Sequence, residues 1–177
     1  CGDGGGRLDL DPYVALGTVA AEGTAKLVGD QGRVLVVVRD IGDAINPAME
    51  AQLKAFQQTL KSRRGLSVTV EKFQLTPMQM LPAGGGIPPE QLLKALASHP
   101  NTGAVVLFFG LPQLSENEVR TLKASGAKLV VVSSLRPGYR QLMERQVIHL
   151  VIAPRVQTPS GGAPRAARRA MGGRRAP

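Results

Sequence analysis

Three short apolar runs along the chain predict the central strands of a parallel sheet. The first is GRVLVVVRD at Gly32–Asp40, in which every residue of Val34–Val38 is apolar and four of the five are β-branched. The other two are AVVLFF at Ala104–Phe109 and KLVVV at Lys128–Val132. Runs without polar positions are typical of strands buried on both faces. We therefore expect an α/β fold: an open, mainly parallel five-stranded sheet flanked by helices, a three-layer arrangement of the Rossmann-like or flavodoxin-like type.

Two weaker patterns extend this sheet to five strands. Ser67–Gln74 (SVTVEKFQ) alternates Val68 and Val70 with polar residues, which favours a strand near the sheet edge. Gln146–Ala153 (QVIHLVIA) is predicted as the last strand, with His149 packed within it or placed at the sheet edge. The expected order is a helix, then strand and helix in alternation, ending on a strand.

Helical signals separate the predicted strands. The chain opens on a helix, because Asp11 is an N-cap candidate and Pro12 suits the first helical position. Gly17 and Gly23 would weaken this helix in isolation. Asn46 is the expected cap of a second helix, whose apolar residues recur at spacings of three and four. This second helix is predicted at Pro47–Ser62. Further helices are predicted at Glu90–Ser98, Ser115–Ser125 (which opens on a Ser-x-x-Glu capping box) and Gly138–Arg145.

The charge of the chain is concentrated at one end. The net charge is +9, from 22 basic and 13 acidic residues, but six of the arginines lie from Arg155 onward, where there is no acid. The remainder is nearly balanced, which argues against nucleic acid as its partner. We divide the chain into an N-terminal tether (1–11), one α/β domain (12–154) and a disordered tail rich in Arg, Gly, Pro and Ala (155–177).

The only cysteine is the first residue, Cys1, and GDGGGR follows it. This start resembles that of a mature bacterial lipoprotein, in which the cysteine carries the lipid. The alternative is an artificial boundary that happens to fall at a cysteine. If Cys1 is the lipid attachment site, a flexible tether holds the domain off a membrane, and the protein lies on the periplasmic or extracellular face of the bacterial cell envelope.

The sequence lacks the residues that the usual binding and catalytic sites of this fold require. Open parallel sheets bind ligands beyond the carboxyl ends of their strands. Neither a G-x-G-x-x-G loop nor a Walker loop occurs, and Phe109-Gly110-Leu111 has no carboxylate where a phospho-receiver domain needs one. His99, His149 and Cys1 do not form a metal-ligand pattern by spacing. We therefore expect no enzymatic activity, no cofactor and no metal.

Polar residues nevertheless follow two of the predicted strands, and they are the candidate ligand-binding residues. For the two aspartates among them, the alternative role is a solvated turn. The candidates are Arg39, Asp40, Asp43, Asn46, Ser133, Ser134 and Arg136.

The order of elements and several phrases resemble one lobe of a type I periplasmic sugar-binding protein, most closely the carboxy-terminal lobe. The phrases include the GDQGRV turn after the opening helix, LLKALASHPNTGAVV, LKASGAKLVVV and the closing LMERQVIHLVIAPR. The similarity covers roughly residues 12–154. It implies a solute-binding fold in which two lobes close round a ligand, whereas this sequence spans one lobe.

The sequence departs from the family at the positions that would hold a sugar. There the family typically presents an Arg, an Asn-Asp pair, an Asp and a Gln, which hydrogen-bond the ligand. The matching residues here are Gln52, Leu111-Pro112, Leu135 and Ile152. We therefore expect a non-catalytic domain that acts by self-association or by binding an envelope protein. The alternatives are a small-molecule cleft completed by a homodimer, and polyanion binding through the basic tail.

Overall fold

Five parallel strands form one sheet in the computed structural model, which describes residues 9–40, 46–74, 87–133 and 138–154. Each strand pairs in parallel with its neighbours, so all five carboxyl ends meet at the same edge. The sheet confirms the expected fold class. The strands lie side by side in the order β2 (Leu66–Gln74), β1 (Gly32–Asp40), β3 (Thr102–Leu107), β4 (Lys128–Val132) and β5 (Leu150–Ile152).

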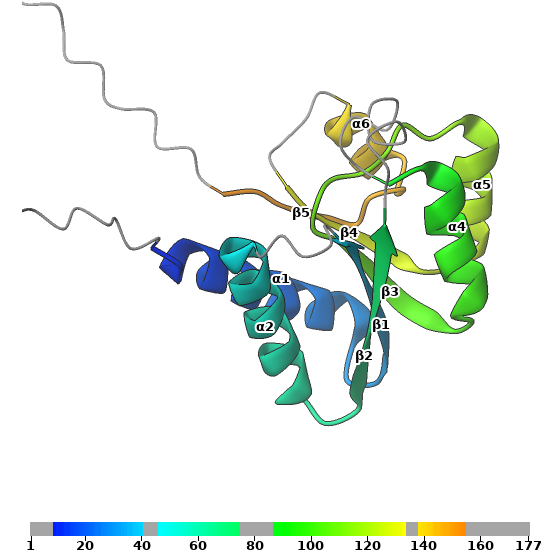
Figure 1. Cartoon of the computed structure of the whole chain (residues 1–177). Helices are drawn as coiled ribbons and strands as arrows, with labels where there is room; N and C mark the ends of the chain where they lie inside the picture. The colour runs from blue at the N-terminus through cyan, green and yellow to red at the C-terminus, as the bar shows by residue number, and fades with distance from the viewer. Residues whose placement is uncertain (1–8, 41–45, 75–86, 134–137, 155–177) are drawn as a thin grey trace, which may run out of the picture.

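Helices cover both faces of this sheet and complete a three-layer architecture (Figure 1). One face carries α1 (Asp11–Val28) and α2 (Pro47–Lys61), which also pack against each other. The other carries α4 (Pro89–Ser98), α5 (Glu116–Ala124) and α6 (Tyr139–Glu144).

Strand β1 lies in the interior because its side chains serve both layers. Val34, Val36 and Val38 contact the core beneath α1 and α2, whereas Leu35 and Val37 belong to the core beneath α4 and α5. All five are at most 3% exposed. The expectation of a strand buried on both faces is therefore confirmed.

Two capping predictions are confirmed and one is wrong. The Asn46 side chain accepts a hydrogen bond from the Met49 N–H (3.2 Å), and Ser115 opens α5 with a complete capping box. Asp11, by contrast, is the first residue of α1 rather than its cap. Its N–H donates to Asp9 Oδ1 at 3.0 Å, so the aspartate two residues earlier satisfies it.

The predicted last strand, Gln146–Ala153, is wrong at its start. Gln146 has a left-handed backbone (φ 55°), and the N–H groups of Val147 and Ile148 both donate to the Leu142 carbonyl (2.8 and 3.2 Å). These contacts form a turn that closes α6. Only Leu150–Ile152 then pairs with β4, because the apolar residues before it are used to bury the turn.

Strand β3 is also displaced from its predicted bounds, Ala104–Phe109. It begins two residues earlier, where Thr102 pairs with Arg33 and its hydroxyl donates to the His99 carbonyl at 2.7 Å. It ends at Leu107, before the two phenylalanines.

The described ranges contain neither a membrane-spanning helix nor a metal-ligand cluster. Among residues 9–40, 46–74, 87–133 and 138–154, no helix is long and apolar enough to cross a membrane. The same ranges hold no group of three or more His, Cys, Asp or Glu side chains arranged for a metal ion.

Candidate functional site

The edge of the sheet where the strands end is the candidate site, and we call it the carboxyl-end rim. Because the strands are parallel, the residues that follow β1, β2, β3 and β4 converge there. Its described members are Arg39, Asp40, Asn46, Gln74, Phe109–Pro112, Ser133 and Tyr139.

On the β1 side of the rim, polar side chains take part in local structure. Asp40 lies opposite Gln74 in the sheet register, and Gln74 Nε2 donates to Asp40 Oδ2 at 3.3 Å. Asn46 uses its side-chain oxygen to cap α2. Arg39 is half-buried and, one residue before Asp40 in the strand, projects to the opposite face of the sheet.

The middle of the rim, after β3, is apolar. Leu111 and Pro112 are buried, and Phe109 packs against the core beneath α4 and α5. The Leu111 N–H donates to the Tyr139 hydroxyl at 3.1 Å, which holds this segment against α6. The segment therefore presents no polar side chain where the sugar-binding lobe that the sequence resembles is expected to carry its Asn-Asp pair.

On the β4 side, Ser133 is the described candidate. Its N–H donates to the Ile152 carbonyl (3.0 Å), and its hydroxyl lies 3.5 Å from that of Tyr139. Tyr139 is 4% exposed, so this pair lies at the inner wall of the rim.

The candidate residues do not form one cluster within the described part of the chain. Arg39, Asp40 and Asn46 lie at the end of β1, and Ser133 lies at the end of β4. Since β3 runs between these strands, they are two strand spacings apart, or about 10 Å. Asp43, Ser134, Arg136, Leu135 and Cys1 lie outside the described residues.

Sequence reasoning missed Tyr139, which ties the β3 and β4 sides of the rim together. It also missed a pair between the end of α4 and the middle of β2, where His99 Nε2 lies 3.0 Å from Glu71 Oε2. No local pattern marks either feature, because the contacting residues come from separate elements.

The chain has the fold of one lobe of the sugar-binding solute-binding proteins of ABC transporters. XylFII superposes with a TM-score of 0.57 at 18% identity, over 77% of this chain and 47% of that one. AraP, an arabinose-binding protein from Geobacillus stearothermophilus, gives 0.58 at 15%, over 77% and 43%. A solute-binding protein from Agrobacterium vitis, bound to α-D-tagatopyranose, gives 0.53 at 18%, over 77% and 43%.

These similarities show the fold and its extent. The chain spans less than half the length of each of these three proteins, as one lobe of two would. The resemblance to one lobe of a sugar-binding protein is thereby confirmed. Neither a family model nor a curated protein matches the sequence.

Proposed function

We propose that this chain is a non-catalytic binding domain whose carboxyl-end rim is closed by a second protein surface, either another copy of the chain or an envelope protein. The observation that carries the proposal is the apolar middle of the rim. Leu111 and Pro112, both buried, stand where a sugar would need hydrogen-bonding groups, and beside them the Phe109 side chain is partly exposed. An apolar centre with polar groups on both sides is typical of protein interfaces.

One structural neighbour supports an interaction role. A chain of the solved XylFII–LytSN complex matches this chain with a TM-score of 0.57 at 18% identity. That neighbour therefore combines the same fold with binding to another protein.

Light scattering on the full chain tests the proposal. We expect a concentration-dependent dimer, because two rims that face each other would cover their apolar centres. Phe109→Glu should shift the protein to monomer, since a charge at the centre of an interface is costly to desolvate. Phe109→Leu should keep the dimer, and Arg64→Glu, at the opposite end of the sheet, should not change it.

Two outcomes would each contradict one part of the proposal. One is a chain that stays monomeric at every concentration, which excludes self-association. Pull-downs from envelope extracts with the wild-type and Phe109→Glu proteins would then test whether an envelope protein binds the rim. That second possibility fails if both proteins retain the same partners. The other is stabilisation by a sugar. A ligand at 100 times its dissociation constant adds about 2.7 kcal/mol, and such a thermal shift would favour the small-molecule alternative instead.

The envelope location is part of the same proposal and rests on Cys1. A lipid on this cysteine would hold the domain at a membrane surface, on the periplasmic or extracellular face. We expect mass spectrometry of the native protein to find a diacyl or triacyl modification on the peptide that begins at Cys1. An unmodified cysteine there would exclude the anchor but leave the rim untouched.

A further inference from the structure

A small hollow lies at the opposite end of the sheet from the rim, where β4 and β5 begin. Its volume is about 180 Å³, and its polar lining comes from Lys123, Lys128, His149 and Gln146. These residues belong to three separate segments: α5, the start of β4 and the turn before β5. Of the described residues that line it, none carries a carboxylate.

The tautomer of His149 is set by the backbone of β4. The backbone N–H of Leu129 donates to His149 Nδ1 at 3.2 Å, and the backbone N–H of His149 donates to the Leu129 carbonyl at 2.8 Å. Because Nδ1 accepts a hydrogen bond, the ring proton of the neutral imidazole is on Nε2. His149 is half-buried and lines the hollow, so it brings an N–H donor there without being charged.

Two ammonium groups make the hollow positive. Lys128 is exposed at the first position of β4, and Lys123 is exposed at the end of α5, where its Nζ donates to the Arg145 carbonyl at 3.0 Å. Burial lowers the pKa of His149, and the charges of Lys128 and Lys123 lower it further. The charges of both lysines therefore act on the imidazole of His149, which lines the same hollow.

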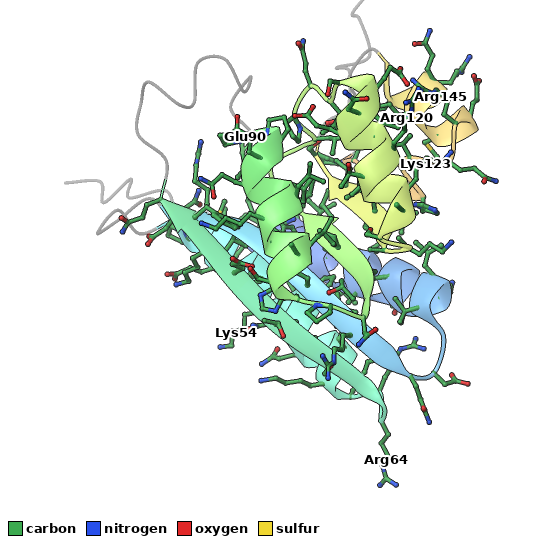
Figure 2. All side chains as sticks on the ribbon, turned by 90° about the vertical axis from the view of Figure 1, so that its right-hand side faces the viewer. Lys54, Arg64, Glu90, Arg120, Lys123 and Arg145 are labelled. Atoms are coloured by element: carbon green, nitrogen blue, oxygen red, sulfur yellow. The ribbon has the colours of Figure 1, made fainter. Side chains whose placement is uncertain are left out.

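The nearby arginine does not share this role. Arg145 forms two hydrogen bonds to Glu116, at 2.9 and 2.6 Å, so its charge is paired on the outer side of α5. In Figure 2, Arg145, Arg120 and Lys123 lie on the α5–α6 side of the domain, well apart from Lys54 on α2. Lys54 is thus a distant lysine of equal charge.

The carbonyl groups at the C-terminal end of α5 do not account for the positions of the two lysines. The end of a helix attracts cations, and this alone could explain Lys123. However, the last carbonyl groups accept hydrogen bonds within the turn: Thr121 from the Ser125 N–H, Leu122 from the Ser125 hydroxyl and Lys123 from the Gly126 N–H. Lys128, beyond the helix, is not explained by it.

From this geometry we propose that the hollow between α5, β4 and β5 is a binding site for a small tetrahedral oxyanion, a sulfate or phosphate group. Lys123 and Lys128 supply the charge and His149 Nε2–H supplies a directed hydrogen bond, which together form the donor set that such anions need. The site is independent of the rim and of its proposed function, since it lies at the other end of the sheet.

Titration of the histidine ring signals by NMR tests this site on the full chain, with sodium sulfate as the probe. The chain has two histidines, so one variant, His99→Gln, assigns both. Sulfate should shift the His149 signals saturably. A bound dianion favours the imidazolium, so the pKa of His149 should rise and sulfate should bind more tightly as the pH falls. Acetate should bind more weakly, and inorganic phosphate should behave as sulfate does.

Matched lysine variants complete the experiment. Lys128→Gln should raise the pKa of His149 by itself, because it removes a positive charge, and should weaken sulfate binding about tenfold. Lys54→Gln should leave both unchanged. The proposal is overturned if sodium chloride at equal ionic strength gives the same shifts of the His149 signals. It is also overturned if the sulfate titration curves of Lys128→Gln and Lys54→Gln are the same.

Discussion

Replacing Phe56 by alanine should lower the free energy of unfolding by about 3–5 kcal/mol. Phe56 lies on α2, is fully buried, and packs edge-to-face against Phe108, with ring centroids 5.4 Å apart and planes at 90°. The substitution removes both the buried ring area and the aromatic contact, and it leaves a cavity beneath α2. Urea unfolding followed by circular dichroism measures the loss.

Two further variants show whether burial is the cause. Phe56→Leu keeps most of the volume and should cost less than about 1.5 kcal/mol. Phe73→Ala, on edge strand β2, removes the same ring from a half-exposed position and should cost less than Phe56→Ala. Equal losses for Phe56→Ala and Phe73→Ala would show that this core is not what holds α2 on the sheet.

Replacing Gly17 by alanine should destabilise the domain by about 2 kcal/mol, although alanine normally favours a helix over glycine by roughly 1 kcal/mol. Gly17 lies in α1 where the helix crosses α2, and an added Cβ would overlap the backbone carbonyl of Gln52. A carbonyl inside a helix cannot turn aside, so the two helices would have to separate. Thermal or urea unfolding of the variant reports the change.

Gly23 is the matched control on the same helix. A Cβ there would meet the Leu150 side chain, whose far end can change rotamer. Gly23→Ala should therefore be close to neutral, since the gain in helix propensity offsets the small repacking. If Gly17→Ala stabilised the protein as much as helix propensity alone predicts, the close crossing of α1 and α2 would be refuted.

The sequence could place the polar residues of the carboxyl-end rim, but not the contacts that they make. Asp40 and Ser133 were placed correctly at strand ends, because a run of buried β-branched residues marks where each strand stops. The pattern did not reveal that Gln74 would bond Asp40, or that Tyr139 would fasten Leu111. Those contacts depend on strand register and on the position of α6, which are set by the assembled core.

The same limit applies to the hollow between α5, β4 and β5. Lys123, Lys128 and His149 carry no common motif, and His149 was predicted only to be packed or to lie at a sheet edge, within a strand; it is half-buried and lies in the turn directly before β5. Its tautomer follows from one backbone N–H of the neighbouring strand. A donor set of this kind exists only after three segments have been brought together.

By itself, the sequence determined the order of elements, the doubly buried centre of the sheet, the caps at Asn46 and Ser115, and the resemblance to one lobe of a sugar-binding protein. All of these depend on local periodicity and on neighbours within a few residues. Tertiary structure alone decided why Gly17 must be glycine, where the last strand begins, and which polar groups meet. Those outcomes depend on packing between elements distant in the chain, and one-dimensional patterning carries no information about such contacts.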